Sequence, residues 1–185
     1  MELEDLTGET EPAEIDIEGT NIHLTAYFID STKAGRKSIF QGIAFWQSGR
    51  LVGEPSWSLG RNLVLDGRTS LAKRYTFIIK SNDLAEYIKE DWSGFKVSDE
   101  IEKVYQAVEN FVNDSFESVT LATISNVTEN LDTPIKQSLK KVNPLVREEV
   151  KSVITEIVKT NPKVKQESVN LVVQTIINME NSKNG

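Results

Sequence analysis

The chain has 185 residues and a formal net charge of −7, with 38% hydrophobic and 26% charged residues, which is long enough for a hydrophobic core in one domain with an appendage. It contains no cysteine, which excludes disulfides and thiolate metal sites and favours a cytoplasmic setting. No apolar run approaches the roughly 18 residues that a membrane-spanning helix needs, so we expect no membrane partner.

The charge is unevenly distributed along the chain. Residues 1–18 contain eight acidic and no basic residues, whereas residues 31–80 contain nine basic and two acidic residues. Residues 81–132 are acidic again, and residues 133–185 are mildly basic. A basic block of this kind can face a polyanion. It can equally be a solvated surface that carries no binding function.

The N-terminal third predicts strands after a linker. Residues 1–14 combine low hydrophobicity with high charge, so we expect a mobile acidic linker. Residues 15–18 and 22–30 alternate apolar and polar side chains, which predicts two strands. Residues 33–37 (KAGRK) predict a basic loop. In residues 38–55, apolar runs flank Gln47-Ser48-Gly49-Arg50, which predicts a β-hairpin with Gly49 at a positive φ angle.

The middle of the chain passes from strand to helix. Residues 63–65 predict a short strand, residues 68–74 a basic connector, and residues 75–79 (YTFII) a strong strand. Residues 81–88 predict a short helix. Ser98 then opens a long amphipathic helix with apolar residues at helical spacing. These apolar residues are Ile101, Val104, Tyr105, Val108, Phe111 and Val112.

The C-terminal region predicts short helices separated by Pro134, Asn143-Pro144 and Asn161-Pro162. Two apolar stripes follow a helical period, one within residues 146–158 and the other within residues 169–177. Helices of this length need a packing partner. The stripes therefore either complete a core within the chain or form a homodimer through the C-terminal helices.

Strands followed by helices predict an α+β fold, with a mostly antiparallel sheet packed by a long helix and followed by an α-helical C-terminal segment. The predicted divisions are the linker at 1–14, the α+β domain at 15–130 and the helical segment at 131–185.

The hairpin sequence resembles a known one. Residues 46–52 (WQSGRLV) are similar to the aromatic-Val-Asn-Gly-Arg-x-Val hairpin in the transducer domain of MutL-like ATPases, of the gyrase/histidine kinase/MutL superfamily. Ser48 stands where that family usually has Asn. The resemblance extends over about residues 15–118. It implies a transducer-like domain that follows an ATP-binding lobe in a longer protein.

In that family a loop beyond the next strand delivers a lysine to the γ-phosphate of ATP on the neighbouring lobe. The corresponding segment here is residues 90–96, which makes Lys96 the phosphate-sensing candidate. The alternative interpretation of Lys96 is an ordinary exposed loop lysine.

The nucleotide-binding motifs of the superfamily are not visible in this sequence. The chain has no Asp-x-Gly-x-Gly and no Gly-rich lid, and without such contacts it has no phosphoryl chemistry. We therefore expect no catalytic residue and no cofactor in this chain, with ATP and Mg bound only by an upstream ATP-binding lobe. The predicted function is non-catalytic: the domain would relay the nucleotide state of a parent ATPase to a partner or a dimer interface.

A nucleic-acid-binding module is the alternative function. Five basic residues are candidates for contacts with phosphate or nucleic acid, and three aromatic residues would add base stacking if they were exposed. The basic candidates are Arg50, Arg61, Arg68, Lys73 and Arg74, and the aromatic ones are Tyr27, Trp46 and Trp57. The competing interpretation is that the basic residues are dispersed.

His23 is the only histidine. A zinc site is not expected with one histidine and no cysteine. A serine-hydrolase triad would need a Gly-x-Ser-x-Gly elbow, which the sequence lacks. We therefore expect His23 to be a structural or exposed residue.

Overall fold

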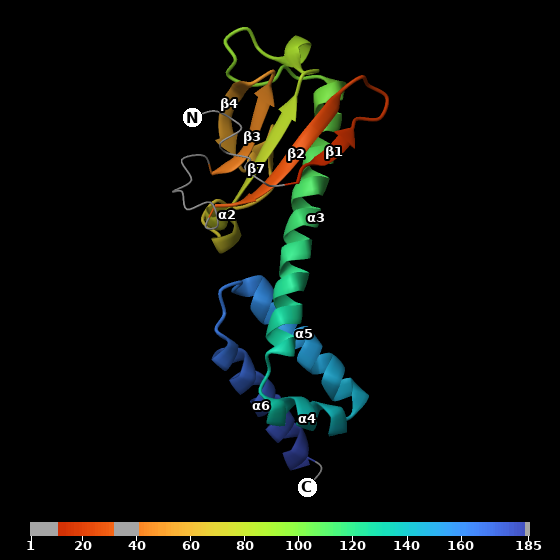
Figure 1. The fold of residues 1–185 in the computed structure, drawn as a ribbon, viewed down its shortest axis with the longest axis vertical. Coiled ribbons are helices and arrows are strands. Elements are labelled where there is room, and N and C mark those ends of the chain that lie inside the picture. The colour runs from red at the N-terminus through yellow and green to blue at the C-terminus, as the bar shows by residue number, and fades with distance from the viewer. Residues whose placement is uncertain (1–10, 32–40, 184–185) are drawn as a thin grey trace. The chain divides into compact units, whose positions relative to one another are not determined.

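The computed structural model describes residues 11–31 and 41–183 (Figure 1). Residues 1–10, which form most of the predicted linker, and the predicted basic loop at 33–37 lie outside these ranges. The chain divides into two compact units, Met1–Ser115 and Phe116–Gly185, and the division falls within a long helix. The boundary expected from the sequence, at residues 130–131, lies just beyond the end of that helix.

The N-terminal unit contains a five-stranded sheet with the strand order β1-β2-β7-β3-β4. Strands β3 and β7 are parallel, and the other neighbours are antiparallel. A separate small ribbon consists of β5 and β6. The α+β class and the mostly antiparallel sheet are thus confirmed. The elements are β1 (Ala13–Asp16), β2 (His23–Asp30), β3 (Gly42–Gln47), β4 (Arg50–Ser56), β5 (Ser58–Leu59), β6 (Asn62–Leu63), α2 (Ser70–Arg74), β7 (Tyr75–Ser81), the 3-10 turn η1 (Ala85–Tyr87) and the start of α3 (Asp99–Glu129).

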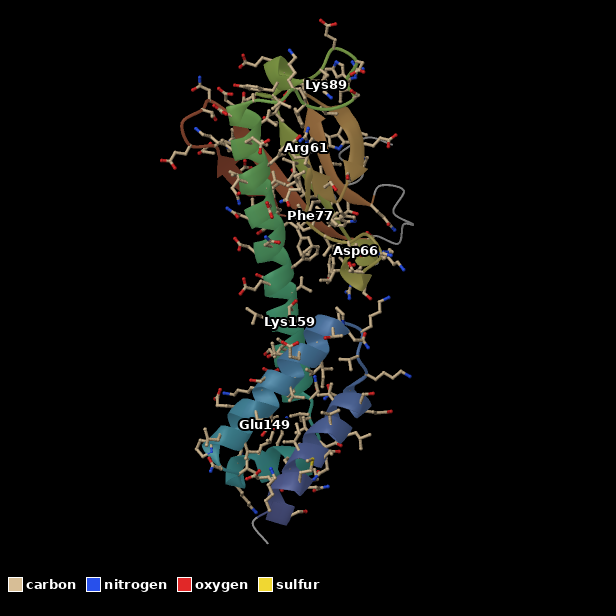
Figure 2. All side chains as sticks on the ribbon, turned by 180° about the vertical axis from the view of Figure 1, so that it is seen from behind. Arg61, Asp66, Phe77, Lys89, Glu149 and Lys159 are labelled. Carbon is tan, nitrogen blue, oxygen red and sulfur yellow. The ribbon has the colours of Figure 1, made fainter. Side chains whose placement is uncertain are left out.

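One face of the sheet packs against α3 through aromatic rings. Phe77 is fully buried, and its ring lies 5.8 Å from the ring of Phe111 on α3. The ring centroid of Phe45 on β3 lies 6.1 Å from that of Tyr105 on the same helix. Figure 2 shows α3 in front of the sheet, with Phe77 between them. The long helix predicted from its apolar stripe is confirmed. Its 31 residues start at Asp99, and the preceding Ser98 accepts a hydrogen bond on Oγ from the Ile101 amide at 3.1 Å.

The opposite face of the sheet carries the alternate side chains of the same strands. Ala44 and Ile78 are buried there, whereas Tyr27, Ile29 and Trp46 are half-buried. Figure 1 looks onto this face, and within residues 11–31 and 41–115 no helix lies over it. The side chains of neighbouring strands thus shield the central residues of this face, Ala44 and Ile78, in part from solvent.

The predicted helix at 81–88 is wrong. Ser81 is the last residue of β7, and the segment after it forms only the 3-10 turn η1. The amide of Leu84 binds the side chain of Gln47 at 2.7 Å, and Ile88 forms an isolated bridge with Phe95. The amides of Tyr87 and Ile88 form i→i−3 bonds and that of Leu84 bonds to a distant strand, so helical i→i−4 pairs do not form here.

Smaller differences concern the neighbouring segments. The predicted basic connector at 68–74 contains α2, whose N-cap Thr69 accepts a hydrogen bond from the Ala72 amide. The strand expected at 63–65 occurs one residue earlier, as β6. Strand β1 begins at Ala13, inside the segment predicted to be a linker.

The C-terminal unit consists of the end of α3 with α4 (Thr133–Lys141), α5 (Pro144–Thr160) and α6 (Gln166–Lys183). Asn143 caps α5 by accepting a hydrogen bond from the Leu145 amide at 2.9 Å, as the Asn-Pro pair predicts. The two predicted stripes pack within one core, whose buried members are Val127, Leu131, Ile135, Val150, Ile154, Val158, Val169, Val173 and Ile177. None of the helices within residues 11–31 and 41–183 combines the length and apolar character needed to span a bilayer.

Candidate functional site

The β3–β4 hairpin closes with the turn that its sequence predicts. Gly49 has a φ angle of 83°, and Ser48 also lies in the left-handed region at 49°, so the two central residues fit a type I′ turn. Ser48 is the less usual occupant, because Asn tolerates this conformation better. Its amide donates to the carbonyl of Ser81 at 3.0 Å, which ties the turn to the end of β7.

The segment between β7 and α3 is held against this hairpin at two further points. The buried side chain of Gln47 accepts from the Leu84 amide, and the amide of Gly53 on β4 donates to the Trp92 carbonyl at 2.8 Å. Gly53 has a φ angle of 65°, and a Cβ there would lie 2.9 Å from the Ser93 carbonyl oxygen. The close approach of this loop therefore requires glycine at position 53.

Trp92 is a strained residue at the edge of the same loop. Its φ angle of 60° is rare for a bulky side chain. The guanidinium of Arg50 lies 4.1 Å from the centre of its ring, in a cation–π contact. Of the basic candidates, Arg50 is therefore the one at the hairpin, and it stacks on an aromatic ring of the loop.

Lys96 lies at the end of this loop, three residues before α3 begins at Asp99. Its amide donates to the Tyr87 carbonyl at 2.7 Å, and its exposed ammonium lies 3.4 Å from the Glu86 carbonyl. A depression of about 360 Å³ in this region is lined in part by the carboxylates of Asp83, Glu86 and Glu100. Lys96 does not line this depression, and the three acidic residues there disfavour an anion inside it.

Two of the other basic candidates are bound to carboxylates. Arg68 contacts Asp66 through Nε at 3.1 Å and Nη2 at 2.9 Å. These hydrogen bonds, with one from the Arg68 amide, lower the pKa of Asp66 to about 2. Arg74 pairs with Asp30 on β2 at 2.9 Å, and this contact raises the pKa of Arg74. To bind a phosphate with its whole guanidinium, Arg68 would have to release Asp66, and Arg74 would have to release Asp30.

Lys73 and Arg61 remain exposed at separate places. Lys73 lies on α2, and Arg61 lies in the turn between β5 and β6 (Figure 2). Arg50 lies beside the C-terminal end of β7, whereas Arg74 directly precedes its N-terminal end. The structure therefore spreads the five candidates over several elements.

The three aromatic residues predicted to stack on bases lie on opposite faces of the sheet. Trp57 is only 7% exposed, and its ring packs 6.0 Å from that of Phe77 on the α3 side, so it is unavailable for a base. Tyr27 and Trp46 lie half-buried on the other face. The ammonium of Lys80 lies 5.0 Å from the centre of the Tyr27 ring.

A histidine–carboxylate cluster is the feature that sequence reasoning missed. His23 Nδ1 lies 2.6 Å from Asp16, and Nε2 is hydrogen-bonded to Glu14. The bond to Asp16 and then that to Glu14 raise the pKa of His23, and the pKa of Glu14 is lowered chiefly by His23 and Thr25. The available signal was the Glu-Ile-Asp alternation at 14–16, which places both carboxylates on one face of a strand.

Within the described ranges there is no group of three or more His, Asp or Glu side chains with the geometry to hold a metal ion. The chain matches no family model, and neither the curated proteins nor the solved structures contain a significant match.

Proposed function

We propose that the N-terminal unit is a non-catalytic, transducer-like domain of a larger ATP-binding protein. It would relay the nucleotide state of an ATP-binding lobe to a partner or a dimer interface. The resemblance of the Trp46–Val52 segment to the MutL-like hairpin motivates this proposal. The structure supports it with a hairpin turn at that segment and with a loop that joins the strand beside the hairpin to a long helix.

The observation that carries the proposal is the position of Lys96. Its ammonium is exposed, and within the part of the chain that the structure describes its side chain makes a single long hydrogen bond, to the Glu86 carbonyl. Moving this amine to a phosphate oxygen would replace that weak contact with a charge-assisted one. An ATP γ-phosphate on a neighbouring lobe is an anion of the required kind.

The loop contacts suggest how such a movement would be relayed. The segment that carries Lys96 is bonded to the hairpin through Gln47 and Gly53, and α3 begins directly after it at Asp99. A displacement of Lys96 would therefore act on both the hairpin and the first turn of the helix. Two discrete arrangements of this loop would be needed for a switch.

A dimer interface in this proposal would have to use side chains outside the buried apolar stripes. The apolar stripes of α5 and α6 are used within their own unit. A homodimer through the C-terminal helices would rely on exposed side chains such as Leu145, Leu171 and Met179, which are 77%, 70% and 59% exposed.

The first test is the reading frame upstream of Met1, which we expect to encode an ATP-binding lobe. The second test is the ATPase rate of the full-length parent protein with Lys96→Met. Removing one charged group that stabilises the transferring phosphate typically costs about 100-fold in rate. We expect a loss of that order, with nucleotide binding retained.

Lys89→Met is the matched control, because Lys89 is an exposed lysine on the same loop (Figure 2). We expect it to leave the ATPase rate unchanged. Equal rates for both variants and wild type would show that Lys96 is an ordinary loop lysine. Stoichiometric, tight ATP binding by the isolated chain, measured by calorimetry, would contradict the whole proposal.

A further inference from the structure

The imidazole of His23 lies between two carboxylates of the edge strand β1. Nδ1 contacts Asp16 Oδ1 at 2.6 Å, and Nε2 contacts Glu14 Oε2. Glu14 and Asp16 face His23 from the neighbouring strand, because Asp16 is paired with His23 and Glu14 with Thr25 in the β1–β2 register. One side chain of β2 thus bridges two side chains of β1.

This geometry fixes the number of protons on the ring. A neutral imidazole has one N–H donor and one acceptor nitrogen, whereas an imidazolium has two donors. Ionised carboxylates only accept hydrogen bonds. Both contacts can therefore form together only when His23 is protonated and charged.

We propose that His23 is a proton-dependent latch that holds β1 on the sheet, and that loss of its proton releases this strand. The latch consists of His23, Glu14 and Asp16. Its partner in regulation is the proton itself, and it acts independently of the nucleotide relay proposed above.

Strand β1 has little else to hold it. It is four residues long, it lies at the edge of the sheet, and none of its side chains is buried. Among the residues that the structure describes, its ladder with β2 is its only strand pairing. Short edge segments with few buried contacts are the parts of a protein that open most easily.

The charged groups near the latch are engaged in contacts of their own. Asp83, in the segment after β7, accepts a hydrogen bond from the His23 amide at 2.9 Å. Glu14 also accepts from Thr25 at 2.9 Å. Lys80 on β7 pairs with Thr25 in the register, but its ammonium lies over the Tyr27 ring. A neutral His23 would leave Glu14 and Asp16 with no positive charge between them, and these two carboxylates repel one another.

The direction of the pH dependence follows from the two shifted groups. The carboxylates raise the pKa of His23 above 6.5, so the contribution of the latch is fully present below pH 6.5 and is lost as the pH rises through the raised value. The pKa of Glu14 is lowered from 4.5, so its part is present above pH 4.5 and is lost as the pH falls through the lowered value. The latch is therefore closed between these two transitions.

The experiment is a proton NMR titration of the whole chain, in which the only histidine gives one set of ring signals. We expect a midpoint above 6.5 in wild type. Asp16→Asn and Glu14→Gln should each lower it. Glu18→Gln is the matched control, because this carboxylate follows β1 and has no contact with the ring, and it should leave the midpoint close to the wild-type value.

Hydrogen exchange on the same samples tests the release of the strand. Corrected for the intrinsic exchange rate, the β1 amides should lose protection as the pH passes the His23 midpoint, while the β7 amides keep theirs. In His23→Gln, the protection of β1 should no longer depend on pH in this range, and the β7 amides report that the sheet is folded. A wild-type midpoint at or below 6.5, or the same pH-dependent loss in His23→Gln, would overturn the latch.

Discussion

The two units of the chain build their cores from different side chains. In the N-terminal unit, Phe77 packs against rings from several segments, with centroid distances of 4.9 Å to Phe28, 6.0 Å to Trp57 and 5.8 Å to Phe111. The core cluster of the C-terminal unit consists only of Val, Ile and Leu. A few large aromatic residues thus join distant segments in the first unit, whereas aliphatic stripes join successive helices in the second.

Unusual backbone and buried polar groups follow the same division. Among the described residues, the non-glycine residues with a left-handed backbone are Ser48 and Trp92, and the buried polar side chains are Gln47, Thr76 and Ser81. All of these lie in the N-terminal unit. Within residues 116–183 neither feature occurs. Strained and buried polar groups persist only where their surroundings hold them, and they concentrate at functional sites. The hairpin and the loop beside it are therefore the better place to look for function.

The largest expected effects come from one core substitution in each unit, which tests whether the two units unfold separately. Phe77→Ala should destabilise its unit by about 3–5 kcal/mol, and Ile154→Ala by about 2–5 kcal/mol, because both side chains are almost fully buried. All three tryptophans, Trp46, Trp57 and Trp92, lie in the N-terminal unit. Tryptophan fluorescence in a urea titration therefore follows that unit alone, while far-ultraviolet circular dichroism follows the helices of both.

We expect Phe77→Ala to shift the fluorescence transition and Ile154→Ala to shift only part of the dichroism transition. If each substitution shifted both signals together, the two units would unfold as one, and the division of the chain would have no thermodynamic meaning.

A second substitution tests whether the loop is held by its close approach to β4. Gly53→Ala should destabilise the N-terminal unit by about 1–3 kcal/mol, because alanine at a positive φ angle is strained and its Cβ would contact the Ser93 carbonyl. Tryptophan fluorescence should also report a changed environment of Trp92. Gly94→Ala is the control on the same loop, because a Cβ there has no neighbour within 4 Å. Similar losses from both alanines would mean that the approach at Gly53 does not hold the loop.

The sequence predicted best what depends on local spacing. The stripes of α3, α5 and α6, the Asn143-Pro144 start and the Gly49 turn are all set by residues close in sequence, and the structure has them. The helix expected at residues 81–88 failed because the side chain of Gln47, on a distant strand, takes the Leu84 amide. No local pattern contains that contact.

The candidate site was less accessible to sequence reasoning for the same reason. Lys96 was singled out by resemblance, but its acidic surroundings depend on how the loop folds. Arg74 is paired with Asp30 across the sheet, and His23 meets Asp16 through strand pairing. Charge counts along the chain could not show which cations were already bound to carboxylates.

The smallest expected effects on stability come from removing one surface ion pair in each unit. Asp66 receives three hydrogen bonds from Arg68, whereas Glu148 on α5 makes a single contact of 3.5 Å with Lys151. Because the folded-state pKa of Asp66 is lowered from 3.8 to about 2, its contribution to stability is present above pH 3.8 and is lost as the pH falls toward 2. A carbon-detected NMR titration should find this midpoint directly.

Arg68→Met should return the pKa of Asp66 toward 3.8, and Lys73→Met, which removes an exposed cation on α2, should leave it low. The Arg68 side chain is 91% exposed, so added salt should weaken the shift and the stability of either variant should change little. Lys151→Met should be equally silent in unfolding. If the pKa of Asp66 stayed low in Arg68→Met, the backbone amide of residue 68 alone would be enough to stabilise the ionised carboxylate. The difference between the Asp66 and Glu148 ion pairs would then come from the turn at residues 66–69 and not from the arginine side chain.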